Sequence, residues 1–400
     1  AMPAAIAIIA EFNPFHTGHA YLLTTLRRHF GPHAALVVIL SGSFVQRGEP
    51  ALFSKWQRAS MAVENGADCV VELPAVYALS SAAGFAAGGA GLAIRLGCTH
   101  LACGVEAGTA GDFLRLARIA RECSASGHGR TAGQALTDAI AAAAPDDLAS
   151  LLQQPNALLA LEYAKAITAS GQELAFLPVP RQGSDHTSGL CGTYTSASAL
   201  RHELTARGLT DQAAAYLPPN CQAAVKKLLA SGAYTDYDRY GDFVLLQNRL
   251  LTPEKLATLP AFSEGLENRW YRMMSEALSY EAALAAVKTK RYAYSRLCRM
   301  GAYTLLQPSQ SLMDASYSEG PQYGRILALN RRGAALIKEA ATHFPMLNRV
   351  KDSRPALSPL GQAQLALDLR ATEIQHYCFT ARTARKGHAD YYESPAFHPE

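Results

Sequence analysis

The chain has 400 residues, of which 49% are hydrophobic and 18% are charged. This composition is typical of a globular protein with a substantial core, and the length favours two or three domains. No run approaches the roughly 18 to 20 apolar residues of a membrane span, and the first residues lack the basic segment of a signal peptide. The eight cysteines form no Cys-x-x-Cys pair, so we expect free thiols in a cytoplasmic protein and no protein metal site.

The formal net charge of +4 is distributed unevenly along the chain. Residues 1–200 carry −2 and residues 201–400 carry +6. A basic half joined to a nearly neutral half favours a polyanionic partner for the second half. An incidental excess of surface charge is the alternative.

The first half alternates short apolar runs with helical stretches. The runs read as strands buried on both faces and lie at 5–10, 35–40, 69–73, 100–103 and 174–179. Helices are expected between them, near 18–30, 54–66, 82–96 and 112–125, and again from about 196. This alternation predicts a Rossmann-like parallel sheet, which binds its ligands at the carboxyl ends of the strands.

After residue 210 the strand signal fades. Helices are expected at 220–231, 242–251, 262–285, 293–306 and 324–342, and a strand-like piece lies near 364–369. We therefore predict a catalytic α/β domain over residues 1–210 and a mainly helical, basic domain over residues 211–400.

A His-x-Gly-His turn follows the first strand directly. His16 and His19 are three residues apart, so they share one face at a helix start. Gly18 permits a phosphate to approach the backbone, and the helix N-terminus adds amide donors and partial positive charge. Two imidazoles there can stabilise charge that develops on an α-phosphate and on leaving pyrophosphate. A pair of structural histidines, or half of a metal site, is the alternative.

This turn is the signature of the HIGH nucleotidylyltransferase superfamily, which often carries a later Ser/Thr motif with a basic residue. Residues 195–201 (TSASALR) fit that motif through Ser198 and Arg201, although the pattern alone is also a good helix cap. Longer segments resemble the bacterial tRNA(Met) cytidine acetate ligase family: AEFNPFHTGH (10–19), SGSFVQRGEPA (41–51), KWQRASMA (55–62), VVELPAVY (70–77), QPNALLALEYAKAI (154–167) and GRILALNRRG (324–333). The resemblance covers almost the whole chain in order.

The resemblance implies an ATP-dependent ligase. Acetate and ATP would give acetyl-adenylate, and the acetyl group would pass to N4 of the wobble cytidine of elongator tRNA(Met). Mg²⁺ would accompany ATP, and the catalytic residues would be His16, His19, Ser198 and Arg201. The implied ATP-binding residues are Ile9, Ala10, Glu11, Phe12, Asn13, Pro14, Phe15, His16, Thr17, Gly18, His19, Ala20, Tyr21, Leu22, Gly104, Asn156 and Arg181. Gly104 lies in the context Cys-Gly-Val-Glu where the family usually has Phe-Gly-Ser-Glu. Its role as an adenine or ribose contact rests on its place after a strand.

Further basic residues suggest where anionic substrates bind. Arg47 and Lys55 could neutralise phosphate or hold acetate, or they could be surface charges. In the second half, five basic residues are interleaved with Tyr292 and Tyr294, a combination that suits contact with the backbone and with an unstacked base of RNA. The expected tRNA contacts are Lys288, Lys290, Arg291, Arg296 and Arg299, extended by Arg331 and Arg332.

Two other functions stay open from the sequence. One is a small-molecule adenylyltransferase or carboxylate–amine ligase that does not act on RNA. The other is a tRNA-binding protein with a vestigial nucleotide site. The intact His-x-Gly-His turn argues against the second, and the basic second half argues against the first.

Overall fold

The computed structural model describes residues 3–123, 132–181 and 197–399. Within this part of the chain, eight strands form one twisted sheet, in the order β10-β8-β5-β2-β1-β6-β7 with β9 beside β8. The strands are β1 Ala5–Ala10, β2 Ala35–Ser41, β5 Cys69–Leu73, β6 His100–Val105, β7 Ala175–Pro180, β8 Gly324–Leu329, β9 Met346–Leu347 and β10 Ala396–Phe397. A separate hairpin pairs β3 Phe44–Val45 with β4 Glu49–Pro50.

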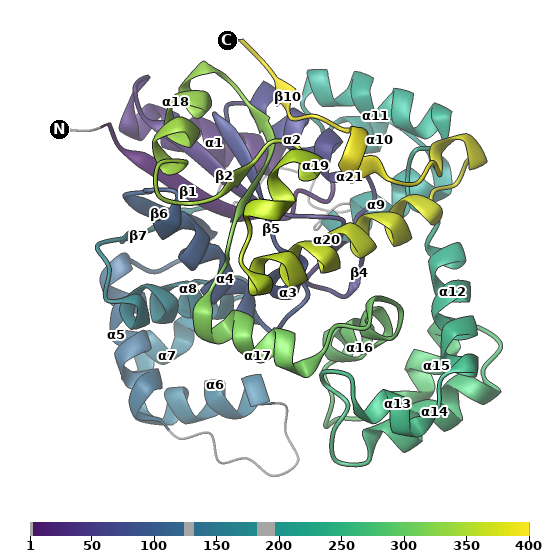
Figure 1. The fold of residues 1–400 in the computed structure, drawn as a ribbon. Helices are drawn as coiled ribbons and strands as arrows, with labels where there is room; N and C mark the ends of the chain where they lie inside the picture. Colours follow the sequence, from purple (N-terminus) through teal and green to yellow (C-terminus); the bar gives the residue numbers. More distant parts are fainter. Residues whose placement is uncertain (1–2, 124–131, 182–196, 400) are drawn as a thin grey trace.

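The five strands predicted in the first half are confirmed, and they pair in parallel. Ala5 lies opposite Ala35, and Ile6 lies opposite His100, so β1 is central between β2 and β6. All seven residues of β2 are buried, as expected for a strand with helices over both faces. The α/β fold class is therefore confirmed, and the carboxyl end of β1 opens at the middle of the sheet (Figure 1).

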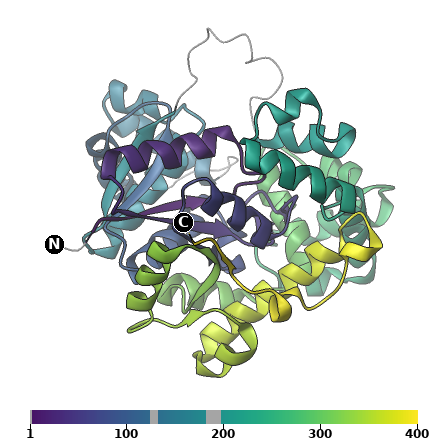
Figure 2. The ribbon, with the colours of Figure 1, turned by 90° about the horizontal axis from the view of Figure 1, so that it is seen from above.

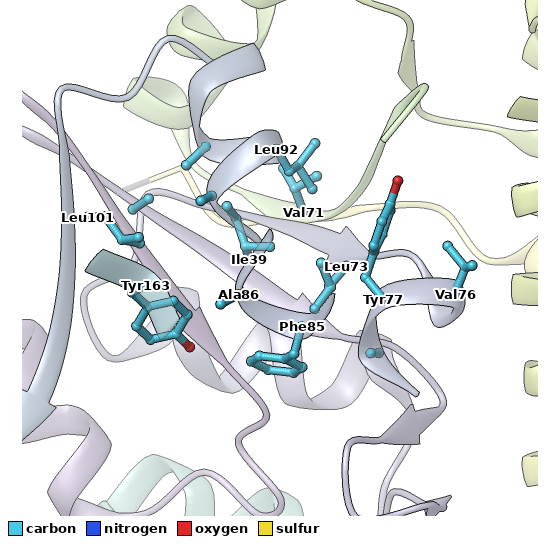
Figure 3. Close-up of a cluster of buried hydrophobic side chains, with 14 of the residues drawn as sticks. Ile39, Val71, Leu73, Val76, Tyr77, Phe85, Ala86, Leu92, Leu101 and Tyr163 are labelled. Carbon is cyan, nitrogen blue, oxygen red and sulfur yellow. The ribbon is translucent and has the colours of Figure 1, made fainter. Parts of the chain in front are cut away.

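The helices of the first half follow the predicted alternation. They are α1 Thr17–Phe30, α2 Lys55–Glu64, α3 Ala75–Ala78, α4 Ala82–Arg95, α5 Ala110–Glu122, α6 Ala132–Ala143, α7 Asp146–Leu151, α8 Ala157–Ser170 and α9 Ala197–Arg207. Apolar residues of α1 and α2 belong to one core cluster, and those of α4, α5 and α8 belong to the cluster on the other face. Figure 3 shows the second cluster, where Ile39, Val71 and Leu101 of the sheet meet Phe85 and Leu92 of α4.

The glycines of α4 allow this helix to lie very close to its neighbours. A Cβ atom at Gly89 would lie 2.3 Å from Cδ1 of Ile9, and one at Gly88 would lie 2.2 Å from Cγ of Tyr77. Larger residues would push α4 away from β1 and α3. The glycine-rich composition of this helix thus has a packing reason, because the backbone must approach the sheet closely.

The second half contributes most of the remaining helices. They are α10 Asp211–Ala214, α11 Pro219–Ser231, α12 Tyr237–Leu250, α13 Pro253–Ala257, α14 Leu266–Glu276, α15 Tyr280–Val287, α16 Tyr294–Leu306, α17 Gln310–Glu319, α18 Arg331–Ala340, α19 Val350–Ser353, α20 Pro359–Tyr377 and α21 Ala389–Tyr392, with short 3₁₀ turns at Arg354–Ala356 and Arg382–Ala384. Helices α12 to α16 share a core of their own around Trp270 and lie together on one side of the molecule (Figures 1 and 2). None of the described helices is both long and apolar enough to cross a membrane.

Three predictions for the second half are wrong. The helix expected over 262–285 is divided into α14 and α15, because Ser279 caps a new helix. Residues 324–329, expected as the start of a helix, form β8, which pairs antiparallel to β5. A short apolar run does not distinguish a buried strand from a buried helix, and only the unpaired edge of β5 decides between them. Residues 364–369, expected as a strand-like piece, lie inside α20, which begins after the cap residue Ser358. The sheet thus includes three strands from beyond residue 210, where the domain boundary was expected.

Candidate active site

A cavity of about 640 Å³ opens at the carboxyl ends of β1 and β6. Thirteen of the residues expected to bind ATP or act in catalysis line it: Ile9, Ala10, Glu11, Phe12, Asn13, His16, His19, Leu22, Gly104, Asn156, Arg181, Ser198 and Arg201. The structure thus brings together residues that lie nearly 200 positions apart. Other residues of the expected stretch do not line the cavity. Among them, Phe15 is buried in the core beneath the turn, and Thr17 and Gly18 are exposed.

The two histidines are fixed by hydrogen bonds to the backbone of their own turn. His16 caps α1, and its Nδ1 accepts a hydrogen bond from the amide of Gly18 at 3.1 Å. Nδ1 of His19 accepts from the amide of His16 at 3.2 Å. The rings stack with their centroids 3.6 Å apart. Because Nδ1 is an acceptor in both rings, the hydrogen of each neutral imidazole resides on Nε2.

Burial keeps both rings neutral. Burial and, to a lesser extent, the charge of the nearby Arg181 guanidinium together lower the pKa of His16 to about 4. The pKa of His19 is lowered well below its usual range, first by burial and then by the charges of His16 and Arg181. At neutral pH the pair therefore presents two N–H donors without positive charge. Such donors are suited to stabilising negative charge that develops on phosphate oxygens.

Three arginines line the same cavity and make it a site for anions. Nη1 of Arg201 donates to the carbonyl oxygen of Asn13 at 2.7 Å, which ties α9 to the turn before α1. Nη1 of Arg47, on the β3–β4 hairpin, lies 3.4 Å from Oγ of Ser198. Arg181 follows β7 and acts electrostatically on both histidines. The convergence of Arg47, Arg181 and Arg201 suits a polyphosphate.

Comparisons with known proteins agree with this geometry. The model of the HIGH Nucleotidyl Transferase family matches residues 3–390. The tRNA(Met) cytidine acetate ligase of Syntrophomonas wolfei is 32% identical, over 98% of this chain and 99% of its own length. The enzyme of the same name from Alkaliphilus metalliredigens is 30% identical, over 99% of each chain. The chain belongs to the tRNA(Met) cytidine acetate ligase family.

A solved structure supports the same assignment. The crystal structure of Thermotoga maritima TmcAL bound with alpha-thio ATP is 27% identical to this chain and superposes with a TM-score of 0.92. The match covers 99% of this chain and all of the Thermotoga chain. The apo crystal form of that protein matches equally well. The family resemblance found in the sequence is thereby confirmed over the full length.

Gly104 and Asn156 line the part of the cavity next to Arg181. A Cβ atom at Gly104 would lie 3.0 Å from Nε of Arg181, so the glycine leaves room for this guanidinium. Asn156 precedes α8 and donates a hydrogen bond to Glu106. The other carboxylate oxygen of Glu106 is buried without a protein partner among the described residues. The absence of a side chain at Gly104 is thus explained by the packing of Arg181, in addition to the predicted role of Gly104 as a nucleotide contact.

Lys55 does not take part in this cavity, contrary to one expectation. Its ammonium group is fully buried, 2.8 Å from Glu72 Oε1 and 2.7 Å from Asp390 Oδ1. Arg325 of β8 also pairs with Asp390, at 3.1 Å. These charges fasten the C-terminal α21 to α2 and to the sheet. Lys55 is therefore a structural ion-pair partner and not a ligand for phosphate or acetate.

Sequence reasoning assigned no role to several residues that line the cavity. Tyr163 of α8 and Phe85 of α4 form part of its wall, and Figure 3 shows the Tyr163 hydroxyl pointing to the side where Phe85 lies. Gln46 of the hairpin and Tyr216, which precedes α11, also line it. Tyr163 lies within a segment that carried the family resemblance, which was the one available signal. Gln46 also lies within such a segment, whereas Phe85 and Tyr216 had no sequence signal, because distant elements bring them to the site.

Several residues near α15 and α16 that were predicted to contact tRNA instead contact other side chains of the protein. Tyr292 is buried, with Arg291 and Arg296 packed against its ring, so it offers no open face to a base. Arg291 also pairs with Glu264. Tyr294 is 41% exposed and keeps an accessible ring. The expectation of two stacking tyrosines is therefore wrong for Tyr292.

Arg299 and Arg332 of α18 also have partners. Nη1 of Arg299 donates to the carbonyl oxygen of Gln46 at 3.3 Å, on the hairpin beside the cavity. Arg332 pairs with Asp68 at 2.8 Å. Helix α18, with Arg331 and Arg332, lies on the opposite side of the molecule from α15 and α16 (Figures 1 and 2). The expected extension of the basic segment by these two residues is thus not one continuous surface.

Proposed function

We propose that this protein is an ATP-dependent ligase that activates acetate as acetyl-adenylate and transfers the acetyl group to N4 of the wobble cytidine of elongator tRNA(Met). The observation that carries the proposal is the turn of His16 and His19. Backbone hydrogen bonds to Nδ1 fix both rings, and both residues line a cavity that three arginines also line. Its support is membership of a family whose relatives bear the name tRNA(Met) cytidine acetate ligase. A tRNA substrate places the protein in the cytoplasm.

The residues of the cavity divide the first step between them. Gly104 and Asn156 hold the nucleoside side of ATP, Arg181 serves the phosphates beside the two histidines, and Ser198 and Arg201 hold the β- and γ-phosphates. Mg²⁺ would accompany ATP as its counter-ion. His16 and His19 donate from Nε2 to the α-phosphate and the leaving pyrophosphate, which lowers the cost of the charge that develops there. Acetate oxygen attacks the α-phosphorus, and pyrophosphate leaves.

The second step requires tRNA beside the same cavity. Lys288, Lys290, Arg291 and Arg296 lie on the helical side of the molecule and would contact the tRNA backbone. Arg299, Arg331 and Arg332 are the weaker candidates, because Arg299 is turned toward the hairpin and α18 lies on the opposite side of the molecule. Positive charge that neutralises phosphates supplies most of the affinity of such contacts. The acetyl group then moves from the adenylate to the cytosine amine.

The test is to incubate the protein with ATP, labelled acetate and a tRNA(Met) transcript, and to analyse the nucleosides by mass spectrometry. N4-acetylcytidine that requires all three components is the expected result. A matched transcript with uridine at the wobble position is the control and should stay unmodified. Pyrophosphate release that depends on acetate, without any acetylated nucleoside, would instead identify a ligase for a small-molecule acceptor.

A further inference from the structure

Glu11 holds an unusual position in this cavity. Glu11 follows β1 directly. Of the described residues that line the cavity, it is the one with an acidic side chain. Its Oε2 accepts two hydrogen bonds, from Oγ of Ser41 at 2.9 Å and from the amide of Gln46 at 2.8 Å. These two donors, from β2 and from the hairpin, fix the orientation of the carboxylate.

Arg58, whose charge acts on this carboxylate, does not form an ion pair with it. Arg58 instead donates to three backbone carbonyl oxygens: Nε to Glu11 at 3.2 Å, Nη1 to Gly42 at 3.0 Å and Nη2 to Ser41 at 2.6 Å. The Glu11 carboxylate thus remains in the cavity as an acceptor. A buried negative charge weakens the binding of acetate and of a triphosphate, so anion binding does not explain its presence.

Among the described residues that line the cavity, the two histidines and the cysteine are not suited to act as a base. His16 and His19 use Nδ1 to accept backbone hydrogen bonds, so Nε2 carries hydrogen and donates. Burial raises the pKa of the Cys103 thiol to about 12. Of the carboxylate, imidazole and thiol groups that line the described part of the cavity, the Glu11 carboxylate is therefore the one suited to accept a proton.

We propose that the Glu11 carboxylate accepts the proton of the cytosine N4 amine in the acetyl-transfer step. This inference rests on the proposed function and assigns to Glu11 a role beyond contact with the nucleotide. N4 attacks the carbonyl carbon of acetyl-adenylate, so a C–N bond forms and the bond from that carbon to the phosphate oxygen breaks. AMP leaves with the electron pair, and one N4 proton passes to Glu11.

The same placement favours cytidine over uridine. A carboxylate accepts a hydrogen bond from the N4 amine of cytosine, whereas uracil presents an acceptor oxygen at that position. A fixed carboxylate therefore attracts the reactive edge of one base and repels that of the other. Glu11 is thus both the proton acceptor and a specificity-determining residue.

The surroundings of Glu11 set the direction of the pH dependence. Burial raises its pKa, and the bonds from Gln46 and Ser41 and the charges of Arg58 and Arg201 oppose that rise. The Tyr163 hydroxyl of α8 also acts electrostatically with it. Because only the ionised carboxylate accepts a proton, the transfer rate should fall as pH falls through the pKa of Glu11.

The experiment measures acetyl transfer separately from adenylate formation, which is followed in a second assay as acetate-dependent pyrophosphate release. Synthetic acetyl-adenylate is supplied with a tRNA(Met) transcript, and N4-acetylcytidine is followed in a single turnover across a pH series. Glu11→Gln keeps the size and the acceptor oxygen, and it should slow transfer by about 10²- to 10⁴-fold, the usual contribution of a general base. It should also remove the acidic limb of the pH profile. Glu11→Asp keeps a carboxylate and should recover part of the rate.

The control is Glu203→Gln on α9, which changes a buried carboxylate that accepts from Thr210 at 3.1 Å, outside the cavity. It should leave the transfer rate near that of the wild type. The inference is overturned if Glu11→Gln transfers acetyl at the wild-type rate with the same pH profile. It is also overturned if that variant loses adenylate formation as strongly as transfer, which would make Glu11 a nucleotide or Mg²⁺ contact. If the wild-type protein itself acetylates no cytidine, the proposed function fails instead.

Discussion

The two histidines of the turn depend on Gly18 as well as on each other. A Cβ atom at Gly18 would lie 2.9 Å from Cε1 of His16, so a larger residue would displace the imidazole that caps α1. The capping bonds fix both tautomers before any ligand arrives. Such preorganised donors cost little reorganisation during the reaction, which is why they act strongly on the transition state.

Replacing either histidine should remove one of these donors. We expect His16→Ala and His19→Ala to slow acetyl-adenylate formation by about 10²- to 10³-fold, measured as acetate-dependent pyrophosphate release. His33→Ala, which removes an exposed histidine outside the cavity, should have no effect. Wild-type adenylate formation in either cavity variant would contradict the assignment.

The pH dependence of the first step follows from the same burial. Because the pKa of His16 is lowered to about 4, its ring is already neutral throughout the neutral pH range. The ring should therefore titrate near pH 4 in an NMR titration of the nucleotide-free protein, and the adenylation rate should show no inflection near 6.5 from this residue. Phosphate charge should raise this pKa, because an anion stabilises the imidazolium form. A titration of His16 near 6.5 without nucleotide would contradict the buried, neutral state.

At the scale of elements, the β3–β4 hairpin connects the helical side of the molecule to the cavity. Arg299 of α16 donates a hydrogen bond to the carbonyl oxygen of Gln46, and the amide of Gln46 donates one to the carboxylate of Glu11. Gly48 has a positive φ of 91°, and a Cβ atom there would lie 2.3 Å from the backbone nitrogen of Arg299. Hairpin and helix are thus in direct backbone contact, and this contact places Arg47 beside Ser198.

Arg299 should therefore affect acetyl-adenylate formation, the step that needs no tRNA. We expect Arg299→Ala to slow acetyl-adenylate formation roughly tenfold, the effect of losing one charged hydrogen bond worth about 1.5 kcal/mol. Its affinity for tRNA should change little, because the guanidinium is turned toward the hairpin. Arg272→Ala, at an exposed position of α14, is the matched control and should not affect the first step. Normal adenylate formation with weakened tRNA binding would make Arg299 a tRNA contact, as its sequence context suggested.

At the scale of the whole molecule, the helices α12 to α16 form a body with a separate core beside the catalytic sheet. The exposed Lys288 and Lys290 precede α16 on this body. The exposed Arg331 and Arg332 begin α18, which lies on the opposite side of the molecule and gives a second basic surface. The two surfaces do not adjoin, so their contributions to tRNA binding are separable.

The salt dependence of binding distinguishes these surfaces. Replacing Lys290, Arg291 and Arg296 together by Ala should weaken tRNA binding and flatten the log–log slope against salt, by about 0.7–0.9 per lost phosphate contact. Adenylate formation without tRNA should fall far less than tRNA affinity. The double variant Arg331→Ala with Arg332→Ala should retain the wild-type slope. The opposite pattern would move the tRNA surface to α18, and binding that ignores salt would exclude phosphate contacts altogether.

The sequence by itself determined the sheet of the first half and the position of the His-x-Gly-His turn after its first strand. Both rest on local chemistry: continuous apolar runs form strands buried on both faces, and a turn after the first parallel strand lies where such sheets bind ligands. His16 and His19 lie side by side because they are three residues apart at the start of one helix, which is a local property of the chain. These features are confirmed because neighbours in the chain are sufficient to specify them.

Only the tertiary structure decided the rest. β8 became a strand because the edge of β5 was unpaired, and Lys55 became a buried ion-pair partner because Asp390 packs on it from 335 residues away. Arg299 is turned toward the hairpin, and Tyr163 toward the cavity, by the packing of separate helices. The sequence shows that a lysine or arginine carries charge. Whether this charge meets a carboxylate, a carbonyl oxygen or solvent depends on contacts between distant segments, which form only when the chain has folded.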